Sequence, residues 1–365
     1  MNITCQQEEL ARFLQITARA LATKSTLPIL TGVLLETKED HLRCVATDLE
    51  IAIEVRVPNI QIMKPGILVL PGRTFVEIVR HLPAVPVSIE LDENSKMVNI
   101  RSKHSTYQLP TLPMEEFPAF PESKNEQSFS VSGEKIREAI KQTIFATLAE
   151  DPRPFLSSIL WEVTPGNLRF VATDVNRLAL KDTPVQSDFQ KTALVPVRAL
   201  REIANIFGNS NEELLNVFLD DKFIFMKGLG ITFSSRLVEA QFPRYEQVIP
   251  KEFNRTVKVQ RSEIIEALER TALVSYSVKL SIKDQQLQIT AKEPDKGRSY
   301  EELHIEFEGP EIDIGFNAKF LLDFLKTVDS DQVSLQLIQE LKPVLMQGVN
   351  DGAYQYIVMP LKLSV

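Results

Sequence analysis

Two kinds of hydrophobic spacing alternate along the chain. Between Leu10 and Leu21 the side chains of one face recur at i, i+3, i+4, i+7 and i+11, which is the spacing of a helix. Over 87–91 apolar and polar residues instead alternate with period two, which is typical of a strand with one buried face. The helical pattern predicts helices over 7–22, 73–82, 134–148, 197–207, 261–274 and 317–328.

This order of elements occurs three times. The quartet Val-Ala-Thr-Asp ends a strand at 45–48 and again at 171–174, and a weaker copy reads Ile-Thr-Ala-Lys at 289–292. Each copy lies between two helical segments and is followed by two period-two strands. A unit of about 120 residues repeated three times accounts for nearly the whole chain.

The repeats predict the fold class and the domains. Each unit has two helices and antiparallel strands, which indicates an α+β layer with both helices on one face of the sheet. Proline-rich polar stretches at 113–127 and 243–254 separate the units, and a Phe-Pro pair occurs in the first at 117–118 and at the start of the second at 242–243. We therefore predict domains at 1–127, 128–253 and 254–365.

Composition excludes several classes of protein. The chain has 365 residues and two cysteines, so a disulfide scaffold is excluded and a reducing cytoplasm is expected. We expect no membrane span, because no run of eighteen apolar residues occurs, and no signal peptide at the N-terminus. A net charge of −8 argues against a uniformly basic surface that coats nucleic acid.

Catalytic and metal-binding motifs are missing from the sequence. There is no P-loop, HExxH or GxSxG motif, and the four histidines stand singly, so we expect no enzyme activity, metal or cofactor. The Gly-Leu-Gly at 228–230 lies between two strand-like runs and predicts a hairpin turn. The Thr-Asp pairs at 47–48 and 173–174 lack an accompanying base or nucleophile, which favours hydrogen bonding at the ends of strands.

Every predicted helix carries spaced cations. The spacings of three, four or seven residues place the members of a pair on one side of a helix. Surface helices commonly carry such residues as solvated charge, but their recurrence in equivalent helices also suits a surface that contacts phosphates rather than bases. The helix over 261–274 carries Arg261 and Arg270. The cations of the other helices, which we expect to contact DNA, are Arg12, Arg19, Arg73, Arg80, Arg137, Lys141, Arg198, Arg201, Lys319 and Lys326.

From end to end the chain resembles the bacterial sliding clamps, the beta subunits of DNA polymerase III. The segments that carry the resemblance are TLPILTGVLLE (26–36), ATDLE (46–50), VATDVNRLA (171–179), FPRYEQVIP (242–250), IGFNAKFLLDFL (314–325) and YIVMPLKL (356–363). The resemblance implies a non-catalytic processivity factor with the DNA-clamp fold, in which a head-to-tail homodimer forms a ring with its helices inside. Duplex DNA would pass through the ring without sequence preference.

The resemblance also implies partners and residues that contact DNA. The partners would be the polymerase III alpha subunit, the clamp loader complex, and other polymerases and repair proteins that carry short peptide motifs. Lys24 and Arg73 fall at DNA-contacting positions of the family. Glu150 falls at a polar one, where an acid is not expected to contact phosphate.

The partner pocket of the family lies between its second and third domains. Val175 and Gln247 depart from the family pattern, in which a Gly and an Arg are usual, so peptide preference is expected to differ. The Met-Pro-Leu run at 359–361 suits an apolar edge that peptides contact. The implied pocket positions are Leu156, Thr173, Val175, Asn176, Arg177, Leu178, Pro243, Gln247, Val248, Ile357, Val358, Met359, Pro360, Leu361, Lys362 and Leu363.

The subunit interface implied by the family joins an edge strand of the first domain to the third domain of the other chain. Tyr107 and Leu109 would meet Leu273 and Val274, while Lys103 would face Glu301 and Glu302. Two alternatives remain open from the residues alone. One is a three-repeat adaptor that binds peptides and no DNA, and the other is an enzyme with a site between repeats.

Overall fold

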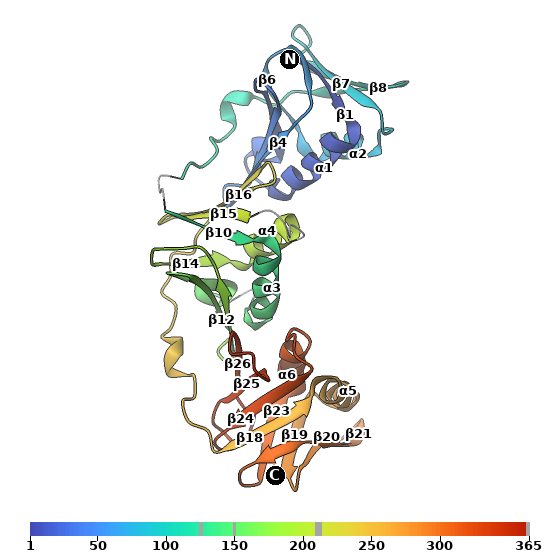
Figure 1. Cartoon of the computed structure of the whole chain (residues 1–365). Coiled ribbons are helices and arrows are strands. Elements are labelled where there is room, and N and C mark those ends of the chain that lie inside the picture. The colour runs from blue at the N-terminus through green and yellow to red at the C-terminus, as the bar shows by residue number, and fades with distance from the viewer. Residues whose placement is uncertain (124–126, 149–150, 209–213, 363–365) are drawn as a thin grey trace. The chain divides into compact units, whose positions relative to one another are not determined.

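The computed structural model describes residues 1–123, 127–148, 151–208 and 214–362, and it divides into two compact units (Figure 1). Unit 1 comprises Met1–Glu134 and Arg198–Leu237, and unit 2 comprises Lys135–Val197 and Val238–Val365. The middle repeat is therefore shared between the units, and each unit contains one junction between consecutive repeats. The domain limits 1–127, 128–253 and 254–365 stay a prediction.

Unit 1 is built on two antiparallel sheets within the described residues. Their strand orders are β5-β1-β7-β8-β9 and β10-β15-β16-β17-β4-β3-β2-β6. The second sheet crosses the repeat junction, because β17 of the middle repeat pairs with β4 of the first. The strands are β1 (Asn2–Gln6), β2 (Gly32–Thr37), β3 (Leu42–Thr47), β4 (Ile51–Val57), β5 (Gln61–Lys64), β6 (Ile67–Pro71), β7 (Pro86–Asp92), β8 (Met97–Ser102), β9 (Ser105–Pro110), β10 (Ser128–Ser132), β15 (Leu214–Leu219), β16 (Phe223–Gly228) and β17 (Ile231–Arg236).

Helices α1 (Gln7–Thr17) and α2 (Gly72–His81) lie side by side in unit 1, as the blue ribbons of Figure 1 show. Leu10 and Leu14 of α1 are fully buried, as the helical spacing predicts. The predicted helix over 7–22 is shorter in the structure, because α1 ends at Thr17 and the chain tightens into a 3-10 turn over Ala18–Ala20. Most of α4 (Val197–Phe207), which matches its predicted range, also belongs to this unit.

Unit 2 repeats this design. Its described strands form two sheets, ordered β14-β11-β12-β13-β26-β25-β24-β18-β22 and β21-β20-β19-β23. Helices α5 (Arg261–Ala272) and α6 (Ala318–Leu325) contact each other, and most of α3 (Gly133–Thr143) lies in this unit. The strands are β11 (Ser158–Thr164), β12 (Asn167–Thr173), β13 (Arg177–Pro184), β14 (Lys191–Pro196), β18 (Arg255–Gln260), β19 (Ser277–Lys283), β20 (Gln286–Glu293), β21 (Gly297–His304), β22 (Glu306–Glu308), β23 (Ile312–Asn317), β24 (Gln332–Leu337), β25 (Val344–Gly348) and β26 (Tyr354–Val358).

The helix-on-antiparallel-sheet architecture predicted from the sequence is confirmed. The predicted hairpin is confirmed too, because Leu229 and Gly230 link β16 to β17 with φ of 57° and 72°, as a two-residue primed turn requires. No helix among the described residues is long and apolar enough to cross a membrane.

The Met-Pro-Leu run at 359–361 exposes apolar side chains, since Met359 and Leu361 are each 38% exposed, but the strand before it does not lie at a sheet edge. β26 is an interior strand that pairs with β13 on one side and β25 on the other, and Ile357 and Val358 are buried. Only the residues after β26 leave the sheet, beginning with Met359, which is 38% exposed. A short apolar run cannot by itself distinguish an edge strand from an interior one, because that difference depends on the neighbouring strands.

The two Thr-Asp pairs form one and the same turn. The Thr173 hydroxyl donates to the Arg177 carbonyl at 2.7 Å, and the Asp174 carboxylate accepts from the backbone N–H groups of Asn176 and Arg177 at 3.0 and 3.1 Å. The turn at 47–51 repeats these contacts at 2.9, 3.1 and 2.8 Å. Hydrogen bonding at the ends of strands is thus the role of both pairs.

This turn forces one residue into the left-handed backbone region. Val175 has φ of 78°, and its counterpart Leu49 has φ of 76°. A β-branched side chain at positive φ is strained by roughly 1–2 kcal/mol. The Val175 side chain is 59% exposed, so little packing offsets this strain.

We predict that Val175→Gly stabilises unit 2 by about 0.5–1 kcal/mol, because relief of the strain exceeds the extra entropy of glycine in the unfolded chain. Val175→Ala retains a Cβ and should not show this gain. Denaturant unfolding followed by fluorescence measures both, since the single tryptophan, Trp161, is buried in unit 2. A glycine variant less stable than the alanine variant would contradict the argument.

Candidate functional site

An apolar pocket of about 230 Å³ opens in unit 2 beside the turn at 173–177. Its walls come from five places: the 3-10 turn at Pro154–Ser157, the turn at 173–177 with the start of β13, the segment 242–248, the residue before β25, and the end of β26. The lining residues are Phe155, Thr173, Val175, Asn176, Arg177, Leu178, Phe242, Pro243, Arg244, Tyr245, Val248, Pro343, Ile357 and Met359. Val175 and Val248 are 59% and 49% exposed, so the rim offers apolar surface to a ligand.

Aromatic rings support one side of this pocket. Phe242 contacts the edges of Phe155 and Tyr245 with ring centroids 6.1 and 6.2 Å apart. The Tyr245 hydroxyl donates to the Glu162 carboxylate at 2.5 Å. Burial, followed by this hydrogen bond, raises the pKa of Tyr245 to about 12, so the phenol stays neutral at ordinary pH. The rings are thereby fixed against the sheet as a rigid apolar wall.

The charge of Arg177 is fully engaged beneath the pocket. Its guanidinium donates to Asp174 at 2.8 Å, to Asp323 at 2.7 Å and to the Phe145 carbonyl at 2.5 Å. The group also lies 4.3 Å from the Phe320 ring centroid, and the side chain is only 7% exposed. Because each guanidinium nitrogen already has a partner, Arg177 shapes the wall and is not available to pair with a ligand.

A different arginine is available at the rim. Arg244 lines the pocket and is exposed, and it has no ion-pair partner among the described residues. Gln247, where the family usually has an arginine, is exposed but does not line the pocket. The positive charge at this rim therefore comes from position 244.

The structure brings together most of the predicted pocket residues, but not all of them. Leu156 and Val358 are fully buried and line no part of the pocket; the neighbouring Phe155 and Met359 take their places. Pro360, Leu361 and Lys362 do not line it, and Leu363 lies outside the described residues. The sequence reasoning missed Phe155, Phe242, Arg244, Tyr245 and Pro343, although FPRYEQVIP was recognised as a motif.

All the predicted DNA-contacting cations are exposed. Five of them are paired with acids: Arg19 with Glu202, Arg80 with Glu77, Arg198 with Asp48, Lys319 with Asp323, and Lys326 with Glu269. Arg137 also interacts with a neighbour. In the described part of the chain Arg12, Lys24, Arg73, Lys141 and Arg201 have no acidic partner, and Glu150 lies outside it.

The predicted interface residues lie on or beside two strands at sheet edges. β9 ends the five-stranded sheet of unit 1, and β21 ends the four-stranded sheet of unit 2. Tyr107 is 43% exposed on β9, whereas Leu109 is 8% exposed, so Tyr107 offers the larger surface to a partner and the interface stays a prediction. Leu273 is 77% exposed, Val274 is half-buried, and Lys103 is exposed in the turn before β9.

The acids expected at the interface already have partners within the chain. Glu301 accepts two hydrogen bonds from Arg270, at 3.0 and 2.8 Å, and Glu302 accepts one from the Tyr300 hydroxyl. Tyr276 and Tyr300 are 57% and 58% exposed. They were not predicted, although exposed aromatic side chains beside an edge strand are a common sign of a protein interface.

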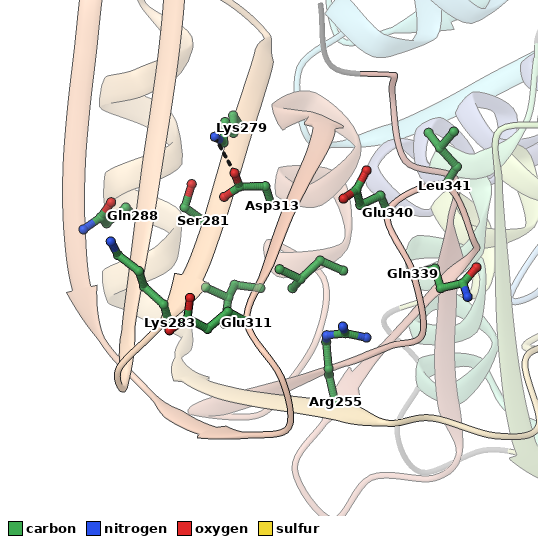
Figure 2. Close-up of a pocket in the computed structure, with 12 residues that line it drawn as sticks. Arg255, Lys279, Ser281, Lys283, Gln288, Glu311, Asp313, Gln339, Glu340 and Leu341 are labelled. Atoms are coloured by element: carbon green, nitrogen blue, oxygen red, sulfur yellow. Dashed lines mark ion pairs between the residues drawn. The ribbon is translucent and has the colours of Figure 1, made fainter. Parts of the chain in front are cut away.

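The described residues also include a second, polar pocket in unit 2 and two buried thiols in unit 1. A polar pocket of about 890 Å³ lies beside β19 and β23, and in Figure 2 its Lys279 and Asp313 form an ion pair at 2.7 Å. No cluster of metal-binding side chains occurs among the described residues. Cys5 and Cys44 are buried free thiols, and burial raises the pKa of Cys5 to about 12.

Three family models cover nearly the whole chain. They are described as the N-terminal domain of the DNA polymerase III beta subunit at residues 1–121, its central domain at 130–244 and its C-terminal domain at 246–362. A curated relative from Pseudomonas putida, named beta sliding clamp, is 32% identical over the full length of both chains.

Solved structures show the same similarity. The crystal structure of the DNA polymerase III subunit beta from Pseudomonas aeruginosa matches with a TM-score of 0.95 and 31% identity, covering all of both chains. The DNA polymerase sliding clamp from Bacillus subtilis matches with a TM-score of 0.95 and 27% identity over the same coverage. The chain therefore belongs to the family of DNA polymerase III beta subunits, the bacterial sliding clamps.

Proposed function

We propose that this sliding clamp closes head to tail with a second copy into a ring around duplex DNA and tethers the replicative polymerase. The observation that carries the proposal is the pair of open sheet edges, β9 and β21. The ring catalyses no reaction. It works in the cytoplasm. Its partners bind to it one after another, and they are the polymerase III alpha subunit, the clamp loader, and other DNA polymerases and repair proteins.

The exposed side chains of the two edges are complementary, because each edge carries a tyrosine while the charges are opposite. β9 carries the exposed Tyr107 and follows the cation Lys103, whereas β21 carries the exposed Tyr300 and the acid Glu302. An unpaired edge strand invites another strand, and native proteins leave long edges open mainly where a partner covers them. Because the two edges differ, the contact is heterologous and has to close into a ring to avoid an open filament.

The helix cations support contact with the phosphate backbone. Those without an acidic partner, such as Arg73 and Lys24, offer their full charge to DNA, while paired ones such as Lys326 are partly neutralised. Such a surface reads no bases and binds through electrostatics. Retention of the clamp on DNA would then come from ring closure and not from affinity.

The apolar pocket of unit 2 supports the tethering role. Its exposed apolar rim and rigid aromatic wall suit one or two apolar anchors of a flexible peptide. Arg244 at the rim favours an acidic residue beside those anchors. Because competing partners would bind the same pocket, one partner would have to dissociate from a pocket before another could bind there.

We predict topological retention on DNA. Clamp loaded on circular duplex should remain bound at a salt concentration that abolishes equilibrium binding, because electrostatic affinity falls steeply with salt. Cutting the circle once should release the protein. Gel filtration of the DNA complex before and after cutting measures this, and equal retention on circular and linear DNA would refute the ring.

We predict that Leu273→Asp converts the dimer into a folded monomer. Leu273 is 77% exposed in the single chain, and a charge buried there on association would lack a partner, costing several kcal/mol. Leu341→Asp is the matched control, because Leu341 is also an exposed leucine of unit 2, at 55%, and belongs to neither β9 nor β21. Sedimentation should give half the dimer mass for the first variant only, and an unchanged dimer would show that the interface lies elsewhere.

We predict that Val248→Asp weakens binding of a polymerase-derived peptide at least tenfold, about 1.4 kcal/mol, because it places a charge on the apolar rim. Arg244→Glu should weaken the binding of peptides that carry an acidic residue beside the apolar anchors more than the binding of the same peptides with a neutral residue there. Fluorescence anisotropy measures both. Leu341→Asp again serves as the control, and binding by Val248→Asp equal to that of the control would overturn the pocket assignment.

A further inference from the structure

Unit 1 contains a second hollow, of about 280 Å³, at the junction of the first and middle repeats. It lies beside the turn at 47–51, which is the counterpart of the turn at 173–177 beside the apolar pocket. Thr47, Leu49 and Pro118 line it in the places that Thr173, Val175 and Pro243 take in unit 2.

Strand register supports this correspondence. Ser235 of β17 pairs with Ile51 of β4, just as Val358 of β26 pairs with Arg177 of β13. Ser234, one residue before Ser235, therefore occupies the position that Ile357, one residue before Val358, occupies in the apolar pocket. The backbone that forms the apolar pocket thus occurs twice in one chain.

Side chains give the second hollow a different chemistry. Ser234 is 1% exposed and lines the hollow, and its hydroxyl has no hydrogen-bond partner among the described residues. A buried hydroxyl without a partner is uncommon in folded proteins and costs free energy until a ligand or water satisfies it. Its counterpart Ile357 is purely apolar.

Charge distinguishes the two hollows as well. Glu50 and Glu122 line the second hollow, are exposed, and have no ion-pair partner in the described part of the chain. The cation of the hollow, Arg236, is engaged: it donates to the Leu49 carbonyl at 2.9 Å and stacks over the Phe223 ring at 5.5 Å. Because neither of these partners is charged, Arg236 keeps its positive charge, and together with Glu50 and Glu122 it gives the hollow a net charge of −1. Arg244 instead makes the rim of the apolar pocket positive.

We propose that the second hollow binds an extended peptide with a small aliphatic side chain next to a lysine or arginine. The aliphatic group lies against Leu49 and Ile51, the basic group faces Glu50 and Glu122, and a peptide N–H or C=O satisfies the Ser234 hydroxyl. That the ligand is a peptide rests on the proposed function of the equivalent pocket. The clamp then has two partner sites of opposite charge preference in each chain.

Two isoleucines make the test direct. Ile51 lines the second hollow and Ile357 lines the apolar pocket, so one methyl group reports on each. Full-length clamp with 13C-labelled isoleucine δ1-methyl groups is titrated with the probe acetyl-Arg-Leu-Ala-Lys-amide and with acetyl-Glu-Leu-Ala-Asp-amide. The two signals are assigned from Ile51→Val and Ile357→Val.

The basic probe should shift the Ile51 signal in a saturable manner, and the acidic probe should leave it in place. Glu50→Gln with Glu122→Gln should weaken binding of the basic probe about fivefold, since two exposed charge pairs are lost. Ser234→Ala should weaken it without a change of charge. Glu115→Gln with Glu116→Gln is the matched control, because it removes two exposed charges of the same repeat outside the hollow and should have no effect.

The proposal would be overturned if the basic probe did not shift the Ile51 signal. It would also be overturned if Glu50→Gln with Glu122→Gln and the control Glu115→Gln with Glu116→Gln lost the same affinity for this probe. The Ile357 signal tests the proposed function separately, through a polymerase-derived peptide. A response at Ile51 without any response at Ile357 would support the second site while contradicting the tethering pocket.

Discussion

The Asp174 carboxylate accepts hydrogen bonds from two backbone N–H groups, and Asp48 does the same in the preceding repeat. These contacts hold one residue of each turn at positive φ. They thereby fix the residue at which the following strand begins, and with it the register of that strand. β13 can therefore pair with β26, and β4 with β17, so that each sheet continues from one repeat into the next. Both hollows lie beside these turns, which means that the continuity of the sheets and the location of the candidate binding sites have the same physical origin.

Each turn is also tied to the second helix of the following repeat, with the charges exchanged. In unit 2 the cation Arg177 belongs to the turn region and the acid Asp323 to α6; in unit 1 the acid Asp48 belongs to the turn and the cation Arg198 to α4. The first pair is largely buried, whereas the Arg198 side chain is 53% exposed and open to screening by salt. Removing the Arg177 side chain would leave the buried Asp174 without a charged partner, which is more costly than the loss of an exposed pair.

Local patterns in the sequence predicted the parts of the fold that depend on local forces. The helical spacing around Leu10 and the turn at Leu229-Gly230 are both set by residues close together in the chain, and both are confirmed. What local patterns could not predict is the burial of side chains that pack against distant strands. Leu109 and Leu156 are buried by neighbours that no local pattern specifies, and β26 is interior only because β13, far away in the sequence, pairs with it.

The net charge of −8 is compatible with a clamp on DNA once the ion pairs are considered. Acids neutralise several helix cations, which leaves Arg12, Lys24, Arg73, Lys141 and Arg201 without an acidic partner in the described part of the chain. Each phosphate contact adds about 0.9 to the steepness with which log K falls with log salt concentration. A small set of free cations therefore gives weak binding. Weak, sequence-independent contacts allow a closed ring to move along DNA, whereas a fully unpaired cationic lining would hold it in place.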